Sequence, residues 1–539
     1  MSSHNTLAVA AATILLVAIT VGVLRRDQPR ERHNAPTSQS LPQPTKIALD
    51  LKAALPEAVT LSSETTAFNK IAESYWARQN REVFPACYVQ PRSVGQLQKA
   101  IKMLRQEYVD SKHTKEKGIG KGLFVVKGGG ANPALGLNNQ NSAVVIDLAH
   151  FRDITFADDN SHVTVGCGLK WEEVYDFLAP RSLTVAGGRT VPVGVSGLAL
   201  QGGMSFYSPV HGFVCSTVTE YNIVLADGSA VVASETSYPD LWRALKGGAN
   251  NFGIVTSFTI PCFPSSDMWF TGNYATGFQA PGLVKAFYEY VRDASSGKPG
   301  AFDDKATIPI TAFGYTRDVG IHATVNYLGY TVPPKDKKWP AYWKKSPFGS
   351  LWNIWSTAKV QSLLSVVKEQ SAASPPGTYS VFAVTTIKND LDTLMAAYRA
   401  YLESSAEGKR VKGMVLALAL QPILPQWFKK GHPNVLGLED CNEPLVIVEF
   451  GIKWDKTEDT ELVQRLTREY IEKVDKDAEA NQAAHPFRFA NYCAEWQDPM
   501  KGYGDENLQF MRNVSRKYDP DGVFQRACLG GFKLGMDYD

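Results

Sequence analysis

Three consecutive glycines follow an apolar stretch of strand type. The stretch is Leu123–Val126, and directly after it come Lys127, Gly128, Gly129, Gly130, Ala131 and Asn132. Glycine lets the backbone approach a ligand closely and adopt conformations that other residues avoid. A turn of this kind can direct several backbone N–H groups at one anionic group, such as a pyrophosphate. A tight strand-to-loop turn without a ligand is the alternative.

Two further segments belong with this loop. One is the glycine-rich run from Gly187 to Gly203, which contains Gly188, Thr190, Val193, Gly194, Gly197, Gly202 and Gly203. The other lies near the C-terminus and contains Asn491 and Tyr492. Bare backbone N–H groups suit a diphosphate, and an extended cofactor needs glycines along its length. Together the three segments favour such a cofactor over a simple turn.

The composition is that of an ordinary globular protein. The 539 residues are 44% hydrophobic and 20% charged, and the net charge is +2. This length predicts more than one domain, and so small a charge gives no electrostatic argument for nucleic acid. The nine histidines and seven cysteines show neither a metal-ligand spacing nor a disulfide framework. We therefore expect no nucleic-acid partner and no metal.

An uncharged apolar run lies near the N-terminus. Leu7–Leu24 is followed by Arg25 and Arg26, and as a helix it would span about 27 Å, enough for a hydrocarbon core. The flanking arginines predict a single-pass membrane anchor over residues 1–26, with the catalytic domain on the cytoplasmic side. A cleaved signal peptide followed by secretion, or a buried helix, is the alternative. Residues 27–64 are polar and proline-bearing, which is typical of a linker.

The elements expected after the linker change in character along the chain. Short strands such as 123–126 and 143–148 alternate with helices in a first domain, residues 65–262. Beyond it, in residues 263–480, runs of strands are interrupted by only two or three helices. This pattern indicates an antiparallel sheet covered on one face by helices.

At these motifs the chain closely resembles the berberine-bridge-enzyme-like FAD-linked oxidoreductases, in particular their fungal branch. These proteins have the FAD-binding domain of the para-cresol methylhydroxylase and vanillyl-alcohol oxidase type. The resemblance covers roughly residues 65–262 and 480–535, and a motif from Trp242 to Thr256 adds to the three segments. It implies an α+β fold of two domains, in which the FAD domain is split around a substrate domain that has a helix-covered antiparallel sheet.

The resemblance also implies which residues bind FAD. The loop at 127–132 and the glycines of 187–203 would hold the pyrophosphate and the ribityl chain. The middle domain would cover the isoalloxazine and form the substrate pocket. Residues 481–539 would return to the FAD domain. The other implied FAD contacts are Gly253, Ile254 and Val255 along the adenine, and Asn491 at the flavin.

Two positions depart from the family pattern. Many relatives attach the flavin through a histidine that follows a glycine pair, where this chain has Gly130, and through a cysteine where it has Thr190. Neither side chain can form that bond. We therefore predict non-covalent FAD, unless Cys167 or another residue is recruited.

Two residues are assigned roles at the flavin by the same resemblance. Tyr492 is the predicted catalytic acid or base, but a phenol has a pKa of about 10 and needs a lowering neighbour to act as a base at neutral pH. Alternatively, Tyr492 stacks on or anchors the flavin without proton transfer. Val193 falls where the family controls access of O2, and valine resembles the oxidase pattern. A valine that only packs in its strand is the alternative there.

The predicted function is an FAD-dependent oxidoreductase with O2 as electron acceptor. Its substrate would be a small organic intermediate of secondary metabolism, oxidised by hydride transfer to flavin N5. Alcohol oxidation, desaturation and oxidative ring closure are all open, because a fold does not fix a reaction. One alternative is a protein that retains flavin and catalyses a non-redox cyclisation, and another is a non-catalytic binding protein.

Overall fold

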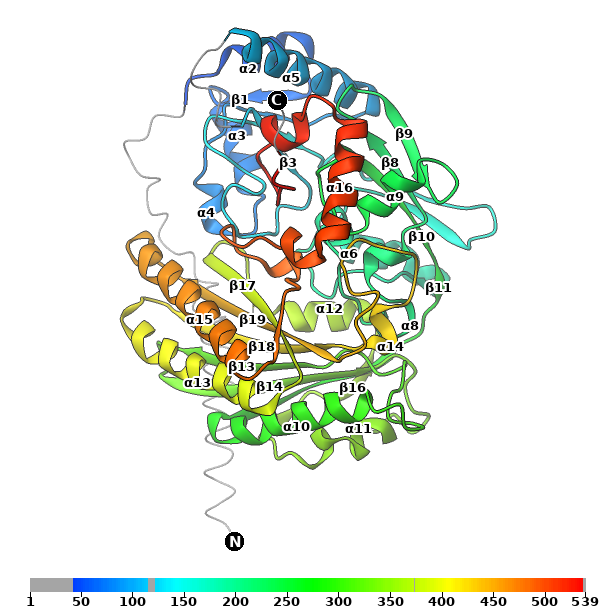
Figure 1. Ribbon diagram of the computed structural model, residues 1–539, viewed down its shortest axis with the longest axis vertical. Coiled ribbons are helices and arrows are strands. Elements are labelled where there is room, and N and C mark those ends of the chain that lie inside the picture. The colour runs from blue at the N-terminus through cyan, green and yellow to red at the C-terminus, as the bar shows by residue number, and fades with distance from the viewer. Residues whose placement is uncertain (1–41, 115–121, 373, 537–539) are drawn as a thin grey trace.

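The computed structural model describes residues 42–114, 122–372 and 374–536. Figure 1 shows two parts, one above the other. The upper part contains the first elements of the chain together with the C-terminal helix α16 (Asp505–Tyr518), and the lower part is built on one large sheet. The chain therefore leaves the upper part once, forms the lower part, and returns.

The upper part contains two small sheets, besides a two-stranded pairing of β7 (Leu183–Thr184) with β11 (Phe263–Pro264). In the first sheet, β2, β4 and β3 are parallel and β1 is an antiparallel edge strand. Its strands are β1 (Val59–Leu61), β2 (Cys87–Val89), β4 (Val144–Asp147) and β3 (Phe124–Lys127). The second sheet is antiparallel, and its strands in spatial order are β5 (Ile154–Phe156), β6 (His162–Gly166), β10 (Ile254–Pro261), β8 (Glu220–Val224) and β9 (Ala230–Ser234).

Short helices connect and cover these sheets. The longest is α5 (Val94–Thr114), in which Leu97, Ile101 and Leu104 recur at helical spacing and are fully buried. The others are α3 (Thr65–Ala72), α4 (Arg78–Arg81), α6 (Trp171–Leu178), α7 (Val195–Leu200), α8 (Ser208–His211) and α9 (Pro239–Leu245).

The predicted linker over residues 27–64 is wrong in its second half. Helix α2 (Lys46–Ala54) begins after Thr45, whose hydroxyl accepts from the Ala48 N–H, and strand β1 pairs with β2. Ile47 and Leu51 are buried at the spacing of one helical face. The polar, proline-bearing residues before position 46 dominate the composition of the segment and conceal this short amphipathic helix.

The lower part confirms the predicted helix-covered antiparallel sheet. Its six long strands, in spatial order, are β12 (Met268–Thr276), β14 (Ile321–Tyr330), β13 (Ile310–Thr316), β18 (Val415–Ile423), β19 (Leu445–Trp454) and β17 (Tyr379–Lys388). The short edge strands are β15 (Trp355–Ser356), β16 (Lys359–Gln361) and β20 (Ala484–His485). Neighbouring strands are antiparallel throughout.

The two faces of this sheet have different neighbours. Phe450 of β19 stacks on Tyr470 of α15 (Thr460–Ala480), with ring centroids 3.8 Å apart. Because side chains alternate along a strand, the adjacent residue Glu449 points to the opposite face, toward the upper part. The helices on the covered face are α10 (Ala280–Ala294), α13 (Leu391–Glu407) and α15, which lie below and beside the sheet in Figure 1. Short helices complete this part: α11 (Ala341–Lys345), α12 (Leu363–Ser371) and α14 (Pro425–Phe428).

The C-terminal segment packs back onto the first sheet. The Leu123 N–H donates to the Ala527 carbonyl at 2.7 Å, and Phe124 forms a parallel bridge with Cys528. Helix α16 also lies against α9. The last residues of the chain therefore support the strand that leads into the triple glycine.

The predicted membrane anchor Leu7–Leu24 lies outside the described residues and stays a prediction. Within the part of the chain that the structure describes, no helix has both the length and the apolar character needed to cross a bilayer.

Candidate functional site

The two glycine-rich segments lie against each other. A Cβ atom added to Gly129 would be only 2.6 Å from the Cα of Gly194. Real Cβ atoms essentially never approach another atom so closely, so glycine is required where the two loops touch. The sequence motifs, separated by some sixty residues, thus form one structural unit.

Cys167 connects this unit to the motif from Trp242 to Thr256. Its N–H donates to the Thr256 carbonyl at 3.0 Å, and its own carbonyl lies beside Gly128. Gly253 packs β10 against β8, because a Cβ there would be 2.5 Å from the Val224 carbonyl oxygen. Ile254 and Val255 follow it as buried strand residues. The predicted contact of Gly253, Ile254 and Val255 with the adenine stays a prediction.

The loop after β3 is held from the interior. Lys127 forms a buried ion pair with Asp147, with its Nζ 3.0 Å from a carboxylate oxygen. Its charge is therefore paired within the protein, and the predicted contact of this loop with a phosphate would be made by the backbone of Gly128 and Gly129, which are half-buried. Ala131 is half-buried beside them, and the Asn132 side chain accepts from the Ala134 N–H in a local turn.

Asn491 joins the C-terminal segment to the glycine-rich run. Its Oδ1 accepts from the Gly203 N–H at 3.1 Å, and its Nδ2 lies 3.4 Å from the Leu198 carbonyl. Gly202 and Gly203 both have positive φ angles, 109° and 77°, so this turn depends on glycine. The structure thus places Asn491 where it fixes the loop. Gly197, one turn earlier in α7, is exposed and has open space around it.

A chain of polar side chains joins the two parts of the molecule. Arg189 donates from Nη2 to the Gln421 carbonyl oxygen at 2.6 Å and to the Tyr492 hydroxyl at 3.1 Å. Gln421 in turn donates from Nε2 to a Glu449 carboxylate oxygen at 3.2 Å. Arg189 and Tyr492 belong to the segments predicted to hold the flavin, whereas Gln421 and Glu449 are on the sheet. The site therefore lies where the predicted flavin segments meet the open face of the sheet.

Glu449 has the protonation behaviour of a proton acceptor near neutral pH. Burial raises the pKa of its carboxyl to about 7, and the positive charges of Arg189 and Lys453 oppose that rise. A group with a pKa near the working pH is well suited to take a proton during a reaction. The sequence prediction missed Glu449, although one glutamate within the apolar strand Leu445–Trp454 was a usable signal.

The pKa of Tyr492 differs from what the role of a base requires. Burial raises the pKa of its phenol above the ordinary value, and the neighbouring Arg189 only opposes this rise. A cationic neighbour is present, as the role of a base would require, but it does not outweigh burial. The catalytic role of Tyr492 stays a prediction, with its hydroxyl in the protonated form at neutral pH.

The residues fit a large cofactor between the glycine loops and the sheet. Nη1 of Arg189 is buried and has no hydrogen-bond partner among the described residues. Leaving such a group without a partner is costly, so an acceptor on a bound molecule would stabilise it. Thr190 and Val193 are half-buried on the same segment. Gly188, by contrast, is packed against Trp171 and offers no surface to a cofactor. Its carbonyl accepts a hydrogen bond from the Tyr175 hydroxyl.

Neither Gly130 nor Cys167 provides a nucleophile for the flavin in the described part of the chain. Gly130 has a φ of 64°, and a Cβ there would lie 3.1 Å from Lys127 and 3.3 Å from Tyr75, so a histidine would be strained at this position. The Cys167 side chain is fully buried, and burial raises the pKa of its thiol. A thiol that is both buried and protonated is a poor nucleophile.

Comparisons with known proteins agree with this geometry. A family described as "FAD binding domain" matches residues 85–234. The FAD-dependent monooxygenase FUP4 of Fusarium proliferatum is 32% identical over 478 residues, covering 85% of this chain and 87% of that protein. The FAD-dependent monooxygenase tpcD of Cochliobolus heterostrophus is 31% identical over 480 residues, covering 86% of this chain and 88% of that protein.

Solved structures share the fold at lower identity. The 6-hydroxy-D-nicotine oxidase of Arthrobacter nicotinovorans has a TM-score of 0.69 at 18% identity, covering 90% of this chain and 98% of that one. The berberine bridge enzyme of Eschscholzia californica also has a TM-score of 0.69, at 14% identity, covering 91% of this chain and 100% of that one. The solved structures show that the chain has the fold of the berberine bridge enzyme, and the two fungal relatives show that it belongs to a family of FAD-dependent oxidoreductases.

Proposed function

We propose that this protein is an FAD-dependent oxidase of a small organic intermediate in secondary metabolism, with O2 as the electron acceptor. The observation that carries the proposal is the path from Glu449 through Gln421 and Arg189 to Tyr492. It places a carboxyl of pKa about 7 opposite the segments expected to hold the flavin. The assignment to secondary metabolism rests on the family resemblance.

The residues of the path have separable roles. FAD, when bound by the glycine loops, would supply the acceptor for a hydride at N5. Glu449 as a carboxylate would take the proton of the oxidised group. Arg189 would use its free Nη1 to hold an oxygen of the substrate or cofactor. Because the Tyr492 oxygen accepts from Arg189, its own proton is available for donation to the substrate.

The open face of the sheet suits a small organic substrate. Ala419 lies opposite Glu449, and Ala417 lies opposite Gly451, so two of the side chains beside the carboxyl on the neighbouring strand β18 are small. Toward the edge, Tyr274 stacks on Trp355 with ring centroids 5.2 Å apart. Small side chains leave room beside the proton acceptor, and aromatic side chains provide apolar contact surface.

We further propose that the flavin is held without a covalent bond. Gly130 and Thr190 support this, as does the burial of the Cys167 thiol. O2 as acceptor is supported by the names of the relatives, which are called monooxygenases or oxidases. Both classes let reduced flavin react with O2.

The test is anaerobic mixing of the purified holoenzyme with metabolite extracts from a strain that lacks the gene. We expect a fraction to bleach the flavin, and air to restore its colour with formation of hydrogen peroxide. Oxygen from labelled O2 in the product would instead indicate a monooxygenase. Product formation while the flavin stays oxidised would overturn the redox proposal in favour of a non-redox cyclisation.

A further inference from the structure

A separate cavity of about 230 Å³ lies on the helix-covered face of the large sheet. Asn273 on β12 and Asn326 on β14 are direct cross-strand neighbours on its floor. The adjacent residues are Tyr274, which follows Asn273, and Val325, which precedes Asn326. Both are in register with Glu449 across the sheet, so their side chains lie with that of Glu449 on the opposite face. Since side chains alternate along a strand, this cavity is separated from the proposed flavin site by the sheet itself.

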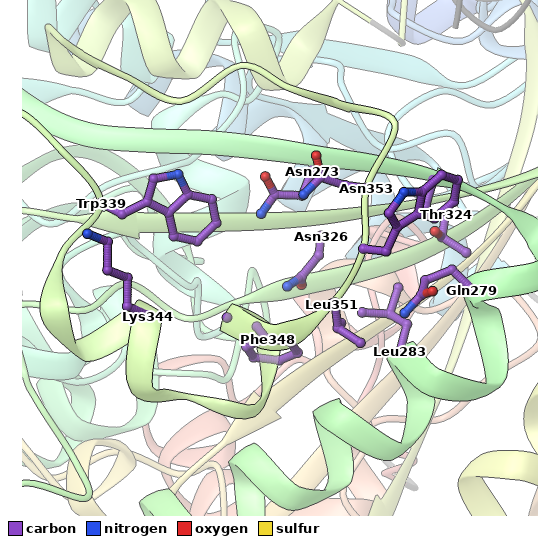
Figure 2. A pocket seen from close by; sticks show the side chains of 13 residues that line it. Asn273, Gln279, Leu283, Thr324, Asn326, Trp339, Lys344, Phe348, Leu351 and Asn353 are labelled. Atoms are coloured by element: carbon purple, nitrogen blue, oxygen red, sulfur yellow. The ribbon is translucent and has the colours of Figure 1, made fainter. Parts of the chain in front are cut away.

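The floor of the cavity presents amide donors. Thr311 donates to the Asn326 side-chain oxygen at 2.8 Å, and Thr271 donates to the Asn273 side-chain oxygen at 3.2 Å. Both threonines are fully buried. Because they bind the side-chain oxygens of the two asparagines, the NH2 groups remain as donors toward the cavity. Asn326 is only 3% exposed, lies near the centre of the lining side chains in Figure 2, and has no partner for its Nδ2 among the described residues.

The walls combine an apolar surface with one positive charge. Trp339, Phe348, Leu283 and Leu351 supply the apolar part. Lys344 supplies the charge, and within the described part of the chain its ammonium has no ion-pair partner. No aspartate or glutamate is among the residues that line the cavity. The site therefore offers donors and positive charge but no carboxylate acceptor.

We propose that this cavity binds a small organic carboxylate, with its oxygens on the Asn273 and Asn326 amides and Lys344, and its apolar body against Trp339. A carboxylate accepts several hydrogen bonds at once, and charge-assisted bonds are stronger than neutral ones. A carboxylate would also satisfy the buried Asn326 NH2, which otherwise has only water to bind. A cavity of this volume admits a single-ring compound rather than a cofactor.

The experiment uses benzoate as the probe and the flavin-loaded full chain as the protein. Saturation-transfer NMR of benzoate measures binding to the wild type and to the variants Lys344→Met and Asn326→Asp. The aspartate keeps the shape and the bond from Thr311 but repels an anion. We expect each variant to weaken binding by about tenfold or more, which is the loss of roughly one charge-assisted hydrogen bond.

The matched control is Lys345→Met, which removes an exposed charge next in sequence that does not line the cavity. It should leave benzoate binding unchanged, and benzyl alcohol, the neutral analogue, should bind more weakly than benzoate. Flavin absorbance and thermal unfolding establish that each variant is folded. The proposal is overturned if benzoate does not bind, if neither Lys344→Met nor Asn326→Asp weakens it, or if benzyl alcohol binds equally well. Benzoate bound on the flavin face would survive both substitutions, so this result is independent of the proposed oxidase activity.

Discussion

Arg189 and Tyr492 lie 303 positions apart in the chain, and the guanidinium of one donates to the phenol of the other at 3.1 Å. The same Arg189 Nη2 also reaches Gln421 on the large sheet at 2.6 Å. One side chain thus joins the glycine-rich segment, the C-terminal segment and the large sheet. Since Arg189 is 6% exposed and charged, each of its contacts matters for the arrangement of the site.

Replacing Glu449 with glutamine should slow the chemical step. The amide can still accept the hydrogen bond from Gln421 but cannot take a proton. Anaerobic stopped-flow absorbance should show flavin reduction slower by about 10²–10⁴-fold, the usual contribution of a general base. An unchanged rate would remove Glu449 from the mechanism, and the flavin spectrum of the variant serves as the control for an intact site.

The reduction rate should rise with pH through about 7, because only the ionised Glu449 carboxyl accepts a proton. Lys453 lowers this pKa, so Lys453→Met should move the rising limb to higher pH, by up to about one unit. Lys453→Arg keeps the charge and should leave the limb in place. A limb that moves to lower pH in Lys453→Met would contradict the assignment.

The stability of the folded protein should fall as the pH rises, whereas the rate of flavin reduction should increase. Glu449 has a folded-state pKa of about 7 against an ordinary 4.5, so the folded protein holds this proton longer than the unfolded chain. Stability from this group is full below pH 4.5 and is lost as the pH rises toward 7. Glu449→Gln should therefore unfold at a higher temperature than the wild type at pH 8, by an amount of the order of 5 °C. Calorimetry at pH 5 should show a much smaller gain.

Acid precipitation should release the flavin into the supernatant. Neither Gly130 nor Thr190 can form a covalent bond to it, and the Cys167 thiol is buried. Absorbance of the pellet and mass spectrometry of the chain measure what is retained. A chain heavier by the mass of FAD would show that another side chain has been recruited.

Asn491→Ala should loosen the C-terminal segment from the glycine-rich run. The substitution leaves the Gly203 N–H without its acceptor, at an expected cost of about 1–3 kcal/mol of folding free energy. Thermal unfolding and flavin retention under dilution measure the effect. Asn442→Ala, at an exposed amide, is the control and should change neither quantity.

The glycine motifs and the strand-rich middle of the chain were predictable because they are local. A triple glycine after an apolar strand has few structural uses, and alternation along a strand is visible in the residues themselves. The same reasoning failed at Lys46–Ala54, where one amphipathic helix follows a long polar stretch. A composition average over the whole segment hid a pattern only nine residues long.

The sequence by itself determined the cofactor class and the family through local motifs, and it has Gly130 and Thr190 where the resemblance implies flavin attachment. Only the tertiary structure decided which groups share the site. Glu449, Gln421, Arg189 and Tyr492 come from four separate stretches of the chain, and their contacts depend on sheet register and on the return of the C-terminus. The pKa of Glu449 could not be predicted from the sequence either, because its burial and its proximity to the charges of Arg189 and Lys453 exist only once the chain has folded.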